Sequence, residues 1–381
     1  MSRNVTAYVG AQIHDGQQLH EDHALIIAPE GHVAIKHIRD LPTGCGVQML
    51  DGGLITPGFV DLQVNGGGGV MFNDDQSVAG LRTIARAHAA SGTCALLPTL
   101  ITDTPARTRA AIDAIAQAIE QSVPGIIGIH LEGPHLSVAR KGAHDPARIR
   151  VMTDEDLDLM LQAAANLPDV MVTVAPENVT NAQITIMAEA GIIVSLGHTD
   201  ADIDTCLSAF DAGARCVTHL FNAMSQMGNR APGLVGATLM REDVHAGLIA
   251  DGIHVHPATM RVALAAKPGP GQIFLVTDAM ATAGSQIDRF MLNGREVFRK
   301  DARLTLADGT LAGADLEMPR ALSVLVDDVG QDISTAVARA TSAPAALLRQ
   351  SDRLAHITGD LQSPLYFKDG FSSPQRLNAD P

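Results

Sequence analysis

The sequence predicts an α/β fold in which a (β/α)8 barrel of the TIM type carries a small β-sandwich domain built from both chain ends. After Pro57, eight short apolar runs alternate with longer segments of helical periodicity. Most of these runs are largely apolar rather than alternating, as in parallel strands that are covered on both faces. With 381 residues, 46% of them hydrophobic and 18% charged, the chain is long and apolar enough to bury such a core.

The two ends of the chain have a different texture, with short strand-like pieces separated by turn residues. Near the N-terminus the expected strands are residues 8–13, 24–27 and 33–35, and near the C-terminus a further strand is expected at 364–367. Because both ends are β-rich, we expect them to pair. The predicted domains are therefore 1–57 and 354–381 as the two parts of the β-sandwich and 58–353 as the barrel.

The barrel elements follow in order along the chain. The expected strands are residues 59–64, 94–98, 126–131, 170–174, 192–196, 215–219, 246–250 and 273–276. Helical patterns cover 78–90 and 104–120, the second with Thr104 as N-cap and Pro105 at the first helical position. Eight repeats favour closure into a barrel. Beyond it, residues 293–298 and 302–306 predict a β-hairpin, 334–340 a helix, and Pro344 the start of another helix.

Composition and charge exclude several classes of protein. Lys and Arg number 27 against 42 Asp and Glu, so the net charge is −15 and no general basic face for nucleic acid or anionic membrane is expected. No apolar run is long enough for a membrane helix, and the N-terminus lacks the pattern of a signal peptide. The four cysteines form no C-x-x-C pair, which favours buried free thiols in the reducing cytoplasm.

Residues suited to metal chemistry end several of the predicted strands. Glu132 follows the third run, His198 the fifth, His219 ends the sixth, and Asp278 follows the eighth. The carboxyl ends of barrel strands meet at one rim, where active sites lie. A carboxylate with two imidazoles is a hydrolytic set for a divalent metal, which lowers the pKa of a bound water to about 7. Asp278 is then left to act as general base and acid.

Other interpretations of these residues stay open on the pattern alone. A single histidine at a strand end is usually an ordinary polar residue, and Asp278 could cap the following helix. His130 precedes Glu132 by two residues and is expected one layer deeper, as a structural neighbour. Arg230, in the loop after the sixth strand, suits recognition of phosphate or carboxylate, but it is equally an ordinary loop cation.

Seven segments, in order and with matching spacing, carry a resemblance to a known family. They are PGFVDLQVNG at 57–66, HLEGP at 130–134, KGAH at 141–144, SLGHT at 195–199, THLFNAM at 218–224, LIADGIHVH at 248–256 and VTDAM at 276–280. On these motifs the chain resembles the N-acetylglucosamine-6-phosphate deacetylase family of the amidohydrolase superfamily, over essentially its whole length.

The resemblance implies an activity and a set of site residues. The implied reaction is hydrolysis of the acetamide of N-acetylglucosamine 6-phosphate to glucosamine 6-phosphate and acetate, in amino-sugar metabolism. Glu132, His198 and His219 would hold one divalent metal per subunit, with zinc expected and iron, cobalt or manganese as alternatives, and Asp278 would be the catalytic acid and base. The implied substrate-binding residues are Ala143, His144, Asn222, Ala223, Arg230, His254, Leu311, Ala312 and Gly313. A homodimer is also implied, with a phosphate contact that crosses the subunit interface.

Two departures from the wider pattern bear on these expectations. Most members of the superfamily hold a second metal with an H-x-H motif on the first strand, where this chain has Gln63 and Asn65. Neutral amides are poorer ligands than imidazole, so we expect these vestigial second-metal positions to be empty or weak. The segment after Gly313 carries Asp315 and Glu317, which the resemblance does not lead us to expect next to the sugar.

Two other functions stay open beside the implied one. One is a different amidohydrolase that acts on an N-acyl or cyclic amide substrate; such enzymes often have H-x-H and a bridging carboxylated Lys or Cys, which Gln63, Asn65 and Glu132 do not match. The other is a non-catalytic sugar-phosphate binding protein, against which the complete set of candidate catalytic residues argues.

Overall fold

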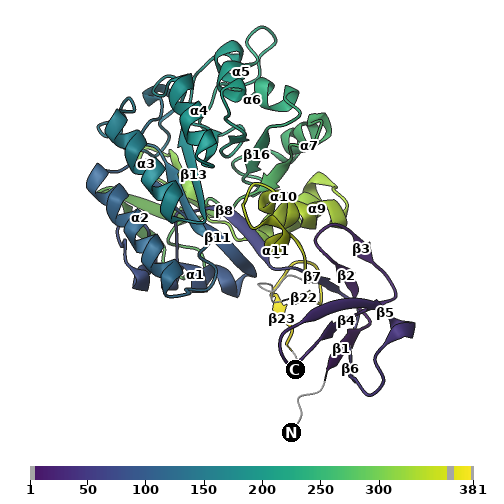
Figure 1. Cartoon of the computed structure of the whole chain (residues 1–381). Helices are drawn as coiled ribbons and strands as arrows, with labels where there is room; N and C mark the ends of the chain where they lie inside the picture. Colours follow the sequence, from purple (N-terminus) through teal and green to yellow (C-terminus); the bar gives the residue numbers. More distant parts are fainter. Residues whose placement is uncertain (1–4, 358–363, 379–381) are drawn as a thin grey trace.

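The centre of the protein is a parallel sheet that curves into a barrel. The computed structural model describes residues 5–357 and 364–378 (Figure 1). The eight strands of this sheet lie in the order β17-β16-β15-β14-β13-β12-β11-β8. They are β8 (Phe59–Val64), β11 (Thr93–Ile101), β12 (Gly128–Glu132), β13 (Asp169–Val174), β14 (Ile193–Leu196), β15 (Cys216–Val217), β16 (His245–Leu248) and β17 (Ile273–Leu275). Each of the eight predicted runs overlaps one of these strands, which confirms the predicted parallel sheet.

Hydrogen bonds beyond the named strands bring the first and last strands together and nearly close the barrel. Val64 and Ala279 form a parallel bridge. The backbone N–H of Asp278 donates to the carbonyl of Gln63 at 3.0 Å, and that of Asn65 donates to Ala279 at 2.9 Å. The carboxyl ends of β8 and β17 are therefore neighbours, so their polar residues share one part of the rim.

Helices cover the outside of the barrel, and Figure 1 shows α1 to α5 following one another around it. The bounds are α1 (Val78–Ala90), α2 (Pro105–Glu120), α3 (Asp154–Asn166), α4 (Asn181–Glu189), α5 (Ile203–Asp211), α6 (Gly233–Met240), α7 (Pro257–Ala266), α8 (Met318–Ser323), α9 (Ile333–Ala340), α10 (Ser342–Ala345) and α11 (Ser351–Ala355). Short turns of other helix types are η1 (Ile38–Asp40), η2 (Val138–Arg140) and η3 (Val324–Val329).

The helix signals in the sequence have local physical causes. The predicted cap of α2 is confirmed, since the Thr104 side chain accepts from the N–H of Arg107 and Pro105 opens the helix. The prediction that Pro344 opens a helix is wrong by two residues, because α10 begins at Ser342. No helix in the described part of the chain is long and apolar enough to cross a membrane.

Two further sheets contain the strands near the chain ends. One has the order β5-β4-β1-β6 and the other β23-β22-β7-β2-β3. Their strands are β1 (Thr6–Val9), β2 (Gln12–His14), β3 (Leu19–His20), β4 (His23–Ile27), β5 (Val33–His37), β6 (Gly46–Met49), β7 (Leu54–Thr56), β22 (Leu365–Phe367) and β23 (Gln375–Arg376). In the second sheet, β22 pairs with β7 in antiparallel register, so strands from both chain ends share one sheet.

The prediction of one continuous strand over residues 8–13 is wrong. The chain breaks at Gly10, where φ is +93°, so that β1 belongs to one sheet and β2 to the other. A side chain at Gly10 would also collide with the carbonyl oxygen of Leu50, so the turn requires glycine for space as well as for φ. Strands β6 and β7 were not predicted.

A small antiparallel sheet follows the last barrel strand. It has the order β18-β19-β20-β21, with β18 (Arg289–Leu292), β19 (Arg295–Lys300), β20 (Arg303–Thr305) and β21 (Leu311–Ala314). The predicted hairpin is confirmed as β19 and β20, with a strand added at each side. A separate two-stranded ribbon, β9 (Gly66–Gly67) with β10 (Val70–Met71), follows β8.

None of the four cysteines, which all lie in the described part of the chain, forms a disulfide bond. Cys206 and Cys216 are buried, whereas Cys45 and Cys94 are only partly buried, so the expectation of four buried thiols is correct for two of them.

Candidate metal centre and active site

The residues predicted at the rim come together inside one cavity of about 390 Å³. Glu132 is the last residue of β12, and His198 and His219 each lie two residues beyond the end of their strand. His198, His219 and Asp278 have φ values of +48°, +32° and +50°. Such left-handed conformations are unfavourable for residues other than glycine and are typical of functional sites. Here they occur directly after the barrel strands, where the chain turns at the rim of the cavity.

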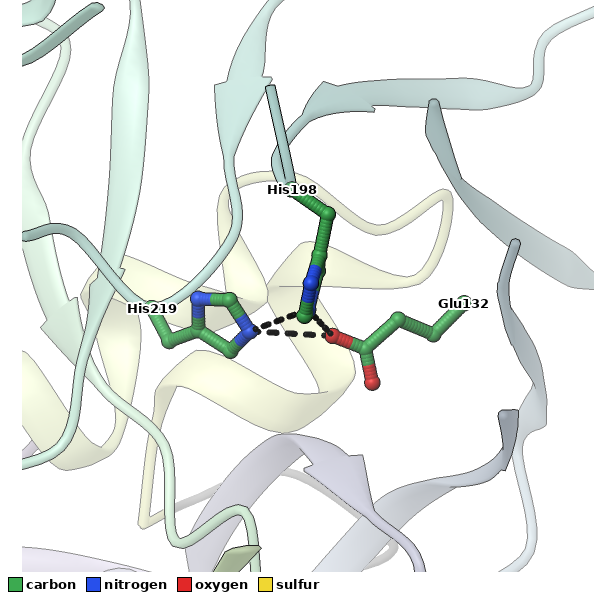
Figure 2. A group of neighbouring side chains, drawn as sticks. All are labelled: Glu132, His198 and His219. Atoms are coloured by element: carbon green, nitrogen blue, oxygen red, sulfur yellow. Dashed lines mark hydrogen bonds and ion pairs between the residues drawn. The ribbon is translucent and has the colours of Figure 1, made fainter. Parts of the chain in front are cut away.

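Glu132, His198 and His219 form a compact set of candidate metal ligands, and their side chains point toward one another (Figure 2). The Glu132 Oε1 atom lies 3.1 Å from His198 Nε2 and 3.0 Å from His219 Nε2, and the two Nε2 atoms are 3.0 Å apart. In tetrahedral coordination with ligand distances of about 2.0–2.1 Å, ligand atoms are about 3.3 Å apart. The spacing of the three atoms therefore fits one small cation.

The hydrogen bonds of His198 also favour a metal between these three residues. Its Nδ1 atom lies 2.8 Å from the carbonyl oxygen of Arg140, so Nδ1 carries the proton and a neutral ring turns the Nε2 lone pair toward Glu132. Two imidazolium rings with their Nε2 atoms 3.0 Å apart would repel each other. A cation between the three atoms would relieve the repulsion between the His198 lone pair and Glu132 and also that between the two rings, because it binds lone pairs that otherwise face one another.

Gln63 and Asn65 hold the two carboxylates of the site. The Gln63 amide nitrogen donates to both Glu132 oxygens at 3.2 Å and to Asp278 Oδ1 at 3.1 Å. The Asn65 amide nitrogen donates to the same Asp278 oxygen at 2.6 Å. Both amide oxygens are buried without a partner in the described part of the chain. The amide groups thus turn their donors toward the carboxylates.

Asp278 is 8% exposed and has a perturbed acidity. Burial, followed by the nearby Glu132 carboxylate, raises the pKa of Asp278, while the hydrogen bond from Asn65 opposes that rise. A carboxyl group whose pKa is raised toward neutrality holds and releases a proton more readily under physiological conditions than an ordinary aspartate does.

His130 is buried beneath the site, as expected for a structural neighbour. Its ring nitrogens contact the Leu62 carbonyl at 3.0 Å and the Thr173 hydroxyl at 2.7 Å. Burial lowers the pKa of His130 to about 4, so the ring is neutral at physiological pH.

Most of the predicted substrate-binding residues line the cavity. Those that do are Ala143, His144, Asn222, Ala223, His254, Leu311 and Gly313. Ala312, between two lining residues of β21, is buried outside the cavity lining. Arg230 is exposed and is absent from the lining formed by the described residues. A single chain therefore does not bring Arg230 into the site.

Two histidines of this set are held by hydrogen bonds. His144 contacts the Thr102 hydroxyl at 2.7 Å, and burial together with the neighbouring His198 lowers its pKa to about 3, so its ring is neutral. The His254 Nδ1 atom lies 2.6 Å from the carboxylate of Asp251, which leaves the opposite ring nitrogen for the cavity that His254 lines.

The acidic residues after Gly313 have structural partners. Asp315 forms an ion pair with Arg299 at 2.7 Å, and Glu317 accepts a hydrogen bond from the backbone of Gly284 at 3.2 Å. Neither acidic residue lines the cavity. Gly313 itself is required by space, since a side chain there would lie 2.5 Å from Met280.

The sequence did not predict some of the lining residues, and among those that the structure describes Arg140 is the only charged one. It lies between Glu132 and His144 in the loop after β12. The signal was available in outline, because loops that follow barrel strands form the site in this fold and this loop contains the basic pair Arg140-Lys141.

The chain is similar to known proteins over most of its length. The profile of the Amidohydrolase family matches residues 54–358. An N-acetylgalactosamine-6-phosphate deacetylase of Shewanella sp. (strain ANA-3) is 40% identical over 347 residues, covering 91% of this chain and 84% of the relative. An N-acetylglucosamine-6-phosphate deacetylase of Haemophilus influenzae is 34% identical over 354 residues, covering 92% of each chain.

Solved structures give the same result. The crystal structure of N-acetylglucosamine-6-phosphate deacetylase from Pasteurella multocida superposes with a TM-score of 0.91 at 33% identity, covering 98% of this chain and 99% of that one. The profile match covers more than half of the chain, and the two relatives named above exceed 30% identity over nearly all of it. The chain therefore belongs to the amidohydrolase family.

Proposed function

We propose that the protein hydrolyses the acetamide of N-acetylglucosamine 6-phosphate, giving glucosamine 6-phosphate and acetate. The observation that carries this proposal is the convergence of Glu132, His198 and His219 with the buried carboxyl group of Asp278 in one cavity. Relatives that bear the name of this deacetylase support the choice of substrate.

The site takes one divalent metal per subunit. Zinc suits a ligand set of two imidazoles and a carboxylate, and iron, cobalt or manganese would fit the same ligands less selectively. Bound there, such a cation supplies Lewis-acid activation of water and of the amide carbonyl. The second-metal positions Gln63 and Asn65 bind no metal or bind one weakly, because their amide donors are already directed at Glu132 and Asp278.

The proton transfers fall to this chain's own residues. Asp278 accepts a proton from the attacking water and later delivers it to the leaving amine. Gln63 and Asn65 keep the Asp278 carboxylate in place through the N–H groups that reach its Oδ1 atom. His144, neutral and fixed by Thr102, lies beside His198 with ring centroids 4.4 Å apart and acts as a donor to the developing oxyanion.

The phosphate is bound away from the reacting amide, so its binding energy positions the substrate. His254 contributes from the cavity wall, held by Asp251. Arg230 lies outside the cavity of its own chain, which supports a homodimer in which it reaches the phosphate in the partner's site.

We propose the same domain organisation and location that the sequence predicts. The domains are proposed as a barrel at 58–353 and a β-sandwich formed by 1–57 and 354–381, supported by the sheet that joins β7 to β22. A cytoplasmic location is supported by four thiols that form no disulfide.

A second candidate substrate is the 4-epimer, N-acetylgalactosamine 6-phosphate. The relative at 40% identity carries the name of that deacetylase, whereas the H. influenzae relative named for the glucosamine substrate is 34% identical. The ratio of kcat/KM for the two epimers decides between them.

Acetate release tests the proposed function. Purified protein, stripped with a chelator and then reconstituted with zinc, iron or cobalt, is incubated with each phosphorylated sugar. Release from either epimer after reconstitution supports a deacetylase. Binding without release in every sample indicates a non-catalytic protein, and release only from other N-acyl or cyclic amides indicates a different amidohydrolase.

A further inference from the structure

Arg140 stands out because of the charge that it brings to the cavity. It is the last residue of η2 (Val138–Arg140) and the only Arg or Lys among the described residues that line the site. The same lining includes the carboxylates of Glu132 and Asp278. A site with two carboxylates needs local positive charge to accept a doubly charged phosphate ester, and among the described residues of a single chain Arg140 is the only arginine that lines it.

The backbone of Arg140 is fixed to the metal centre. Its carbonyl oxygen accepts the hydrogen bond from His198 Nδ1 at 2.8 Å, and its own N–H donates to Ser137 at 3.1 Å. The base of the side chain is therefore held at a constant position relative to the candidate metal ligands. A cation fixed in this way can orient a substrate whose amide must reach the metal.

The guanidinium group is only partly committed to the protein. Its Nε atom donates to Asp200 at 2.8 Å, in a pair whose side chains are 38% and 50% exposed. Neither Nη atom has a hydrogen-bond partner among the described residues. Exposed ion pairs of this kind contribute little to stability, and the free Nη atoms leave a two-nitrogen face that matches the oxygens of a phosphate.

The loop also lies against the side of the cavity where substrate-binding positions are proposed. A Cβ atom built on Gly142 would lie 3.9 Å from the Cβ of Ala223 and 3.4 Å from Cε1 of His198. The segment that follows Arg140 thus bridges the candidate metal ligands and the Asn222-Ala223 pair. Arg230, by contrast, lies outside the cavity of this chain.

We propose that Arg140 binds the phosphate group of the substrate within its own subunit and makes the enzyme selective for phosphorylated over unphosphorylated sugar. This inference rests on the proposed function. The alternative is a purely structural role, in which the Arg140–Asp200 ion pair only anchors the loop that supports His198. In that case loss of either partner impairs all substrates alike.

The test compares Arg140→Ala with the matched control Asp200→Asn, which breaks the same ion pair but keeps the cation. Acetate release is measured from N-acetylglucosamine 6-phosphate and from N-acetylglucosamine, at equal metal content. Loss of a charged hydrogen bond lowers kcat/KM for the phosphorylated sugar roughly 10- to 100-fold, mainly through KM, with a much smaller change for the unphosphorylated sugar. Asp200→Asn keeps the preference for the phosphorylated sugar.

Equal losses on both sugars, no loss on either, or the same loss of preference in Asp200→Asn would overturn the assignment. If Arg140→Ala does not fold, Arg140→Gln, which keeps a long polar side chain, takes its place.

A titration with inorganic phosphate separates this inference from the proposed function. Calorimetry on the metal-loaded proteins needs no turnover, and we expect phosphate to bind Arg140→Ala about tenfold or more weakly than the unchanged protein. If the unchanged protein releases no acetate from any sugar, the proposed function fails, and the titration still decides the role of Arg140. Equal phosphate affinity in the two proteins contradicts it.

Discussion

Replacing Asp278 by Asn removes a titratable group while leaving the site's hydrogen bonds largely intact. The Oδ1 atom that accepts from Gln63 at 3.1 Å and from Asn65 at 2.6 Å remains an acceptor in asparagine. The side chain keeps its volume, and Glu132, His198 and His219 are unchanged. We therefore expect Asp278→Asn to fold and to hold its metal, so that any loss of activity reports on proton transfer.

The magnitude follows from the role assigned to Asp278. A positioned general acid or base contributes about 10²- to 10⁴-fold to the rate, which corresponds to about 3–5 kcal/mol of activation free energy. Asp278 serves both proton transfers in the proposed reaction, so we expect the loss in kcat to approach or exceed the upper end of that range. KM should change little, because the residue makes no proposed contact with the sugar or the phosphate.

The assay is steady-state acetate release from N-acetylglucosamine 6-phosphate, with metal content measured on the same samples. A loss of about 10³-fold or more in kcat at unchanged metal content is the expected result. A kcat within about tenfold of the unchanged protein would refute the assigned role. Loss of metal from the variant would show instead that Asp278 is a ligand.

Three further predictions concern the metal, the acidity of the site and the subunit interface. His219→Ala removes one of three ligands, so metal content measured by elemental analysis should fall to near zero, whereas His254→Ala should retain its metal; full metal content in His219→Ala contradicts the ligand set. Asn65→Ala removes a donor that favours the charged form of Asp278, so the pKa of Asp278 rises and the acid limb of the kcat/KM profile moves to higher pH; a shift to lower pH reverses the argument. Arg230→Ala should raise KM for the phosphorylated sugar far more than for the unphosphorylated sugar. Hybrid dimers of one Arg230→Ala chain and one Asp278→Asn chain should recover activity at low substrate concentration, because the site that keeps Asp278 receives an intact Arg230 from its partner. Absence of recovery would place Arg230 outside the partner's site.

The barrel was predictable from sequence because its strands are buried on both faces. A continuous apolar run such as Ile273–Val276 is buried throughout, and no polar side chain within the run favours an exposed position. The chain ends were less predictable. The residues 8–13 read as one strand because each is compatible with extended structure, but Gly10 redirects the chain between two sheets, and that depends on the approach of Leu50 from a distant segment.

The candidate site also contains residues that were predictable from the sequence and residues that were not. Glu132, His198, His219 and Asp278 were predictable because the end of a barrel strand fixes where a residue lies. Loop residues lack such a rule. Arg140 enters the cavity because its carbonyl oxygen meets His198, a contact between residues 58 positions apart in the sequence. The basic pair Arg140-Lys141 marks the loop, but no local pattern shows which of its residues lines the cavity. Arg230 belongs to a motif that resembles the family, yet its place outside the cavity is visible only in the folded chain.

In the proposed function, deacetylation depends on a metal held by Glu132, His198 and His219. The most direct measurement is acetate release from N-acetylglucosamine 6-phosphate and its 4-epimer, by chelator-stripped protein and by the same protein after addition of one equivalent of zinc, iron or cobalt. We predict no release from stripped protein and recovery that saturates at one metal per subunit with at least one of these cations. Full activity in protein shown to be free of metal, or no release from either sugar with any cation, would contradict it.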